Sequence, residues 1–344
     1  MEMVEKAPEV QSEPGGVLVL VRHGQTEWNA SGRFSGWADV SLNDRGRREA
    51  KAMGELLAEH DFYPADAYSS RLERARETLD VVLECLGGGA WDRPALARHA
   101  PAWELNERHY GALTALVKRQ AADQFGAEQV KNWRRGFAVR PPEMHESHPW
   151  HELIYDGGTY DDVDDGVVLP TGESLEDCEK RCVAYVSAHV LPRVAAGRHG
   201  LVSAHNNTIR CLLHALCRES EEVMTRFEMP TGGAIVLKIG GDGTVVGRQD
   251  LTPPRPVDLG DDDDFAITDD TALAWPLPGG DSAASCTESF AGIAAFLACS
   301  APPPVDGKRD LGDDAALADA HATYRDAVDD DAVAAGASKL YCAD

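Results

Sequence analysis

Two short, largely apolar segments limit the folds that this chain can adopt. Residues 17–21 (Val-Leu-Val-Leu-Val) end at Arg22-His23-Gly24, and residues 200–204 (Gly-Leu-Val-Ser-Ala) end at His205. An apolar run of this length is typical of a strand that is buried on both faces, as in a parallel sheet. In such sheets, ligands bind beyond the carboxyl ends of the strands. His23 and His205 each follow a strand end, so they are the first candidate functional residues.

Helical patterns alternate with these strands. Between residues 43 and 60 apolar positions recur at helical spacing, behind an Asn43 or Asp44 cap. The remaining elements expected before residue 250 are strands at 66–70 and 234–239, and helices at about 72–85 and 207–216. Strands that alternate with helices indicate an α/β fold with a mostly parallel sheet.

The acidic charge of the chain is concentrated at its end. The 344 residues include 33 Lys and Arg against 58 Asp and Glu, a net charge of -25, and residues 253–344 alone hold 19 acidic and 5 basic residues. We therefore expect a flexible acidic leader (1–16), a catalytic domain (17–250) and an acidic, Pro/Asp-rich tail (251–344) that is largely disordered. A solubilising tail, a regulatory or docking tail, and adaptation to salt remain open.

Composition also excludes several functional classes. A strongly acidic chain is repelled by nucleic acid, and no apolar run is long enough to span a bilayer. The beginning of the chain is acidic, unlike the basic leaders of exported proteins. The eight Cys lie far apart, which favours reduced thiols and a cytoplasmic location. Cys178 and Cys182 are one helical turn apart but lack further ligands, so no metal site is expected.

The Arg22-His23-Gly24 motif is weak evidence by itself, because a single His is often only a hydrogen-bonded structural residue. Neighbouring residues of a strand point to opposite faces. Arg22 and His23 can therefore serve one pocket only if the strand ends there, and Gly24 permits such a sharp exit.

Longer stretches identify a family. Those that match it are residues 18–29, 33–39, 72–75, 105–113, 130–142, 170–175, 205–210 and 230–232. Together they resemble the cofactor-dependent phosphoglycerate mutases of the histidine phosphatase superfamily. The Arg-His-Gly start marks only the superfamily, whereas residues 106–111 (Asn-Glu-Arg-His-Tyr-Gly) and 133–137 (Trp-Arg-Arg-Gly-Phe) are specific to the mutase branch. The resemblance implies a three-layer α/β/α fold, followed by an irregular acidic extension that has no counterpart in the family.

The resemblance also implies a catalytic group. His23 is expected to carry the phosphoryl group, Arg22 and Arg74 to clamp its oxygens, His205 to stabilise the charge in transfer, and Glu107 to act as general acid and base. A neutral imidazole can attack phosphorus, and a neighbouring guanidinium disfavours its protonated form. The positions that match phosphate and substrate contacts are Asn29, Ser35, Gly36, Tyr110, Lys118, Arg134, Arg135, Asn206 and Asn207.

Two features of this set can be checked in a structure. Arg134 and Arg135 are adjacent and cannot point the same way within one helix, so we expect them at a helix end or bridging two ligand groups. The family has Gly where this chain has Asn206, which raises the question of whether Asn206 crowds the pocket or distorts a Gly-like backbone. The acidic segment 144–168 is expected to be a loop near the cleft.

The implied reaction is the interconversion of 3-phosphoglycerate and 2-phosphoglycerate in glycolysis and gluconeogenesis. The resemblance implies that 2,3-bisphosphoglycerate primes His23 and that no metal is needed, because arginines supply the positive charge. A phosphatase on the same scaffold is the close alternative, and bisphosphoglycerate synthase activity is a weaker one. A catalytically impaired scaffold that binds a partner through its acidic tail is a further alternative. A homodimer and a homotetramer are both open.

Overall fold

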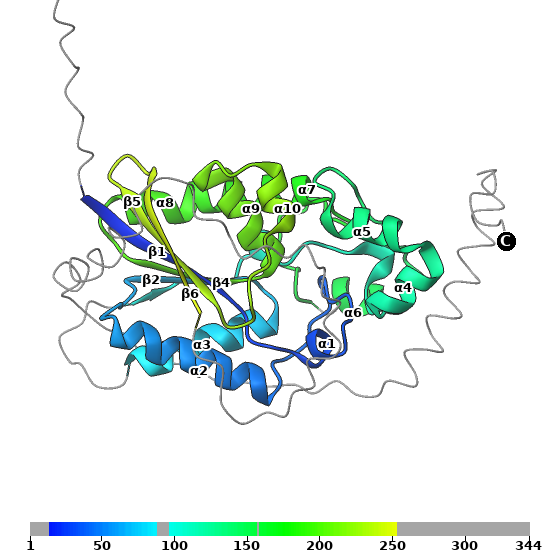
Figure 1. Cartoon of the computed structure of the whole chain (residues 1–344), viewed down its shortest axis with the longest axis horizontal. Coiled ribbons are helices and arrows are strands. Elements are labelled where there is room, and N and C mark those ends of the chain that lie inside the picture. Colours follow the sequence, from blue (N-terminus) through cyan, green and yellow to red (C-terminus); the bar gives the residue numbers. More distant parts are fainter. Residues whose placement is uncertain (1–13, 88–95, 157, 253–344) are drawn as a thin grey trace, which may run out of the picture.

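The computed structural model describes residues 14–87, 96–156 and 158–252, so most of the expected leader and of the expected tail lies outside the described residues. Within them, a six-stranded sheet has the order β3-β2-β4-β1-β5-β6 (Figure 1). The strands are β1 (Pro14–Arg22), β2 (Asp66–Ser69), β3 (Ala97–Arg98), β4 (Gly200–Ala204), β5 (Ala234–Gly240) and β6 (Val245–Leu251). The pairs β3-β2, β2-β4 and β4-β1 are parallel, whereas β1-β5 and β5-β6 are antiparallel. The predicted mostly parallel sheet is confirmed.

Helices cover both faces of the sheet, as the three-layer prediction requires. Val17, Val19 and Val21 of β1 pack in one cluster with α2 (Asp44–Glu59) and α3 (Glu73–Gly87). Leu18 and Leu20 point to the opposite face. The elements on that face are α7 (Leu175–Tyr185), the π-helical turn η3 (Val186–Val190), α8 (Leu191–Ala195) and α9 (Asn206–Cys217). Burial on both faces explains why β1 is apolar from Val17 to Val21.

The chain leaves β1 through a tight contact with α2. A Cβ atom at Gly24 would lie 2.2 Å from the carbonyl oxygen of Gly46, so only glycine fits between the two backbones. Asn43 caps α2 by accepting a hydrogen bond from the amide of Gly46, and its own amide donates to the carbonyl of Gln25. The loop after His23 is thereby fixed to the beginning of α2.

A long excursion between β3 and α7 lies beyond the carboxyl ends of the parallel strands, beside α1 (Glu27–Ala30) (Figure 1). Its helical elements are the 3-10 turns η1 (Trp103–Leu105) and η2 (Gly111–Leu113), followed by α4 (Lys118–Phe125), α5 (Ala127–Arg135) and α6 (His151–Tyr155). One further helix, α10 (Glu221–Arg226), packs against α9.

The segment 144–168, expected to be an irregular loop, contains α6. Trp150 and Tyr160 of this segment pack in one cluster with Trp37, and none of the described residues of the segment lines the pocket described below. It supports the pocket wall from behind. In the described part of the chain, no helix is long and apolar enough to cross a membrane.

Candidate active site

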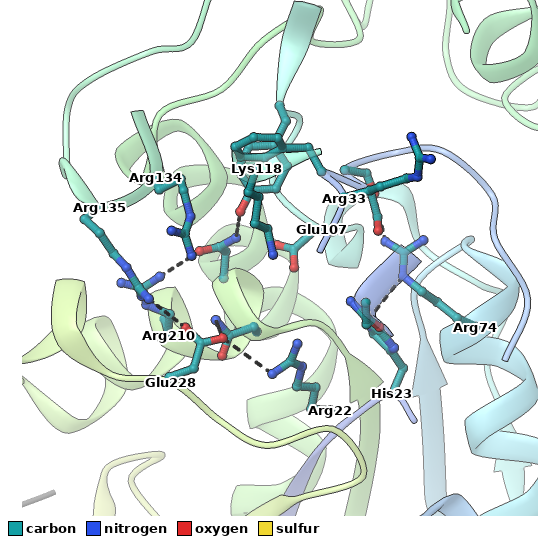
Figure 2. A pocket seen from close by; sticks show the side chains of 17 residues that line it. Arg22, His23, Arg33, Arg74, Glu107, Lys118, Arg134, Arg135, Arg210 and Glu228 are labelled. Carbon is teal, nitrogen blue, oxygen red and sulfur yellow. Dashed lines mark hydrogen bonds and ion pairs between the residues drawn. The ribbon is translucent and has the colours of Figure 1, made fainter. Parts of the chain in front are cut away.

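A pocket opens beyond the carboxyl ends of β1 and β4 (Figure 2). Among the residues expected at the site, those that line it are Arg22, His23, Asn29, Ser35, Gly36, Arg74, Glu107, Tyr110, Lys118, Arg134, Arg135, Asn206 and Asn207. His205 lies directly behind this surface. Four lining residues were not predicted, namely Arg33, Phe34, Arg210 and Glu228. Segments that are far apart in the sequence thus converge on one cationic pocket.

His23 is held in one orientation and one protonation state. Its Nδ1 lies 2.7 Å from the carbonyl oxygen of Gly24, a contact that requires the proton on Nδ1. Nε2 then carries the lone pair and accepts a hydrogen bond from Nε of Arg74 at 3.3 Å. Burial, followed by the positive charges of Arg74 and Arg22, holds the pKa of the ring well below its ordinary value of 6.5. Neutral His23 therefore presents a nucleophilic Nε2.

Arg74 is positioned by the backbone of the loop that carries Ser35. Its Nη1 donates to the carbonyl of Ala38 at 2.9 Å and its Nη2 to the carbonyl of Gly36 at 2.8 Å. Only 1% of the residue is exposed. Arg74 therefore joins the first turn of α3, the loop and the ring of His23 into one unit.

His205 is the N-cap residue of α9, and its ring centroid lies 5.0 Å from that of His23. Its Nε2 is 2.8 Å from Oγ of Ser70, while Nδ1 is buried without a hydrogen-bond partner in the described part of the chain. Burial and the charge of Arg74 lower its pKa well below 6.5. A buried polar atom beside the nucleophile, without a protein partner, suits a contact to a ligand oxygen.

Glu107 is a buried carboxyl group on the opposite wall. It is 8% exposed, and burial raises its pKa above the ordinary value. Its Oε1 accepts a hydrogen bond from the amide of Arg108 at 2.7 Å. Its backbone carbonyl accepts one from Nε1 of Trp37 at 2.7 Å. A carboxyl group with a raised pKa on a fixed backbone can both give and take a proton near neutral pH.

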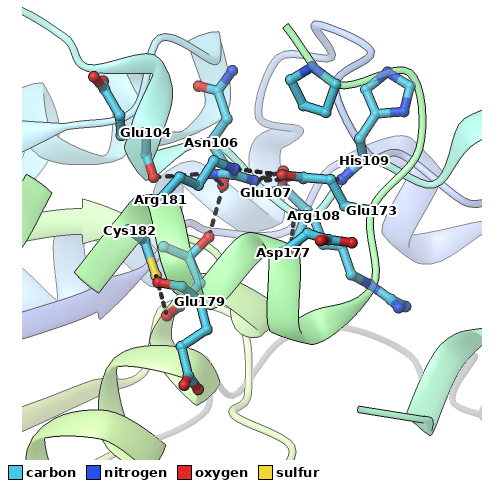
Figure 3. A network of polar contacts seen from close by, with 12 residues as sticks. Glu104, Asn106, Glu107, Arg108, His109, Glu173, Asp177, Glu179, Arg181 and Cys182 are labelled. Atoms are coloured by element: carbon cyan, nitrogen blue, oxygen red, sulfur yellow. Dashed lines mark hydrogen bonds and ion pairs between the residues drawn. The ribbon is translucent and has the colours of Figure 1, made fainter. Parts of the chain in front are cut away.

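A buried ion pair fixes this backbone from behind (Figure 3). Arg181 of α7 binds both carboxylate oxygens of Glu173 at 2.7 Å. The same guanidinium donates to the carbonyls of Glu104, Asn106 and Glu107 at 2.8–2.9 Å. One arginine thereby satisfies three carbonyls of the segment that carries the candidate acid. The sequence did not single out either member of the pair.

The cationic wall comes from the excursion. Lys118 is the first residue of α4, and Arg134 and Arg135 are the last two of α5, so the expected place at a helix end is confirmed. Burial, followed by the charge of Arg134, lowers the pKa of Lys118 to about 8. Tyr110 meets this wall from the other side, where its hydroxyl accepts a hydrogen bond from Nδ2 of Asn207 at 3.0 Å.

Two of the unpredicted residues complete the wall. Arg210 lies one turn after Asn207 on α9 and donates to its Oδ1 at 2.9 Å. That spacing was the available signal for Arg210. Glu228 follows α10, and its Oε2 lies 3.1 Å from Nη2 of Arg135. An acidic residue in an anion pocket has no local sequence signal.

Asn206 does not distort the backbone at the position where the resemblance implies Gly. It begins α9 and is not among the residues with positive φ in the described part of the chain. Its side chain is engaged by two hydrogen bonds: Nδ2 donates to Oε1 of Glu228 at 3.1 Å, and Oδ1 accepts from the amide of Met229 at 3.0 Å. The backbone requirement considered for this position is therefore absent, and a new side-chain contact is present.

Metal ligands are not gathered at this site. Within the described ranges, no group of three or more His, Cys, Asp or Glu side chains is arranged to hold a metal ion. Reaction without a metal remains a prediction.

Comparison with known proteins identifies the family of this chain. The sequence profile described as histidine phosphatase superfamily (branch 1) matches residues 18–153 and 156–251. A protein of Maricaulis maris (strain MCS10), named 2,3-bisphosphoglycerate-dependent phosphoglycerate mutase, is 41% identical over 239 residues, which are 69% of this chain and 95% of that protein. One of the same name from Erythrobacter litoralis (strain HTCC2594) is 43% identical over 221 residues, 64% of this chain and 92% of that protein.

A solved structure named "Mycobacterial hydrolase 1" is similar in fold. The TM-score is 0.50 at 22% identity, over 70% of this chain and 100% of that one. By its sequence profile and its 41–43% identical relatives, this chain belongs to the histidine phosphatase superfamily and, within it, to the 2,3-bisphosphoglycerate-dependent phosphoglycerate mutase family.

Proposed function

We propose that this protein interconverts 3-phosphoglycerate and 2-phosphoglycerate by passing a phosphoryl group through Nε2 of His23. The observation that carries the proposal is the neutral imidazole beside two guanidiniums, with Nδ1 bound to the carbonyl of Gly24 and an unprotonated Nε2 that accepts a hydrogen bond from Arg74. Glu107, with its raised pKa, lines the same pocket. A nucleophile, a proton carrier and anion donors are the groups that this reaction needs.

Each phosphoryl transfer is accompanied by a proton transfer to or from Glu107. When the 2-hydroxyl of 3-phosphoglycerate attacks the phosphoryl group on His23, the new O–P bond forms as the N–P bond breaks, and Glu107 takes the hydroxyl proton. The electron pair of the broken bond returns to Nε2, which becomes neutral again. The same groups act in reverse when the 3-phosphate returns to His23 and its oxygen leaves with the proton of Glu107. Arg22, Arg74 and His205 stabilise the negative charge on the oxygens in transfer.

The pocket suits the doubly phosphorylated cofactor of the relatives. Seven Arg or Lys side chains and two Glu side chains line it. Oγ of Ser35 and Nε of Arg22 are buried without a hydrogen-bond partner in the part of the chain that the structure describes. These atoms, with Lys118 and Arg135, would hold two phosphates and a carboxylate. When bound, 2,3-bisphosphoglycerate supplies the phosphoryl group that first charges His23.

Further expectations belong to the same proposal. No metal is required, because guanidiniums supply the charge that Mg²⁺ supplies elsewhere. The expected partners are a small phosphoglycerate and other copies of the chain, in a homodimer or a homotetramer. No binding to nucleic acid or to a membrane is expected. A cytoplasmic location is supported by the free state of Cys178, Cys182 and Cys211, which are buried between α7 and α9.

The test is a coupled assay for 2-phosphoglycerate, run with and without added 2,3-bisphosphoglycerate and with a chelator throughout. We expect activity that depends on the cofactor and survives the chelator. Isotope-labelled donor should leave an acid-labile phosphoryl group on wild-type protein and on His145→Ala, an exposed control, but not on His23→Ala. Release of free phosphate without 2-phosphoglycerate would instead identify a phosphatase, and no labelling of the wild type would identify an impaired scaffold.

A further inference from the structure

A carboxylate that the family resemblance does not assign sits among the cations of the pocket. Oε1 of Glu228 lies 3.6 Å from Nη1 of Arg22, and Oε2 lies 3.1 Å from Nη2 of Arg135 (Figure 2). Arg22 flanks the nucleophile, and Arg135 belongs to the cationic wall on α5. Glu228 therefore occupies space between two cations that an anionic ligand would use.

The chain holds this carboxylate in place from both sides. The amide of Asn206 donates to Oε1 of Glu228, and its oxygen accepts from the backbone of the next residue, Met229. Nη1 of Arg22 in turn donates to the carbonyl of Met229. A glycine at position 206 would make none of these side-chain contacts. Asn206 and the carboxylate of Glu228 thus form one structural unit.

The carboxylate is charged under all ordinary conditions. Partial burial raises its pKa, but the charges of Arg22 and Arg135 outweigh this effect and bring the pKa to about 2. Its side chain is still 42% exposed, so it lies where ligand and solvent both reach it. An arriving dianion therefore meets a fixed negative charge at short range and competes with it for the same guanidiniums.

We propose that Glu228, held by Asn206, is an internal counter-ion of the anion pocket that a ligand must displace from Arg22 and Arg135. Before the ligand arrives, the carboxylate offsets the repulsion between the guanidiniums of Arg22 and Arg135 and keeps both side chains extended. The same negative charge weakens the binding of an anionic ligand. The opposing field grows with ligand charge, so the doubly phosphorylated cofactor is penalised more than monophosphorylated substrates. Only this last consequence rests on the function proposed above.

The direct test measures anion binding without turnover. Sulfate is titrated calorimetrically at pH 6.5, where it is a dianion and Lys118 remains protonated. Glu228→Gln is expected to lower the sulfate Kd roughly tenfold, a close-range effect reduced by the partial exposure of the site. Glu221→Gln, an equal charge change on exposed α10, should leave Kd unchanged. Equal or weaker sulfate binding by Glu228→Gln would overturn the proposal.

A second variant tests the role of Asn206. Asn206→Gly should lower the sulfate Kd about two- to threefold in the wild-type background, because Glu228 is then less firmly held. In the Glu228→Gln background it should have no further effect. An equal effect in both backgrounds would contradict the pairing. If Glu228→Gln melts at a much lower temperature than the wild type, the test rests on Asn206→Gly alone. An unchanged sulfate Kd in that variant would then contradict the proposal.

Turnover then separates this inference from the proposed function. In the mutase assay, Glu228→Gln should lower the half-saturating concentration of 2,3-bisphosphoglycerate more than it lowers the KM for 3-phosphoglycerate. Absence of mutase activity in the wild type would refute the proposed function, yet it would leave the sulfate titrations fully interpretable.

Discussion

Nε of Arg74 donates a hydrogen bond to Nε2 of His23 over 3.3 Å, at a point where both side chains are almost completely buried. The contact directs a positive charge at Nε2, the proposed nucleophilic atom, so that atom stays unprotonated. The same guanidinium would be a donor for an oxygen of a phosphoryl group on this atom. In the proposed reaction, a single guanidinium would therefore keep His23 unprotonated before the transfer and stabilise charge during it.

Replacing Arg74 tests this double role. Arg74→Lys keeps the charge but loses the fork that binds the carbonyls of Gly36 and Ala38. We expect kcat/KM to fall about 10²–10³-fold, and the free energy of unfolding to fall by about 1–3 kcal/mol. Arg76→Lys, a partly exposed position on the same helix, is the control and should change both by little. Normal kcat/KM in Arg74→Lys would contradict the assignment.

Lys118 is expected to make anion binding weaker at alkaline pH. Its pKa of about 8 means that it is protonated below this pH and loses its charge as pH rises through it. Anion affinity should fall in the same direction, with a roughly fivefold rise of KM for 3-phosphoglycerate between pH 7 and 9, equivalent to about 1 kcal/mol. Lys118→Arg remains charged and should remove this rise. Identical pH profiles of KM in the two proteins would show that another group titrates.

Ser70 is expected to set the tautomer of His205. We expect its hydroxyl to donate to Nε2 across the 2.8 Å contact, which leaves the proton on Nδ1, an atom without a hydrogen-bond partner among the described residues. Ser70→Ala should lower stability by about 1 kcal/mol, and kcat roughly tenfold, with little change in KM. Nitrogen chemical shifts of His205 report the tautomer directly. Ser69→Ala, at the neighbouring buried serine, is the control, and a kcat loss confined to it would reject the idea.

The buried ion pair of Glu173 and Arg181 should contribute strongly to the stability of the segment that carries Glu107. Glu173→Gln leaves Arg181 without its compensating charge, although the three carbonyl contacts remain. We expect a loss of about 3 kcal/mol in urea unfolding. Glu176→Gln breaks an exposed pair with Lys180 and should cost less than about 0.5 kcal/mol. Similar losses for the two variants would mean that the buried pair contributes little.

The sequence predicted the parts of the fold that follow from periodicity and burial. β1 and β4 are buried on both faces, so their apolar runs and the histidines at their ends could be recognised. β6 was missed because it is a half-exposed edge strand that includes Arg248 and Asp250, and such a strand lacks an apolar pattern. The helix start at Asn43 was correct because its cap is a local interaction.

At the site, local motifs identified most of the residues that line the pocket, but they missed Glu228 and the residues that hold the pocket walls. Glu173 and Arg181 are eight positions apart on the chain, yet their importance arises from carbonyls some 75 residues away. Glu228 and Asn206 likewise meet only because the segment after α10 folds back over the beginning of α9. Contacts of this kind depend on tertiary packing, which no local pattern encodes.

The pairing of β1 with β4 places Arg22 opposite Ala204, and this register fixes the positions of His23 and His205 relative to each other. A slip of one residue would turn either of them to the wrong side of the sheet. The cations of α4 and α5, in contrast, come from the excursion outside the six-stranded sheet, where an isolated bridge between Arg33 and Val117 ties the beginning of α4 to the loop after α1. Such a division is a form of modularity: substitutions in the excursion can change which ligands the pocket accepts without disturbing the sheet that positions the two histidines.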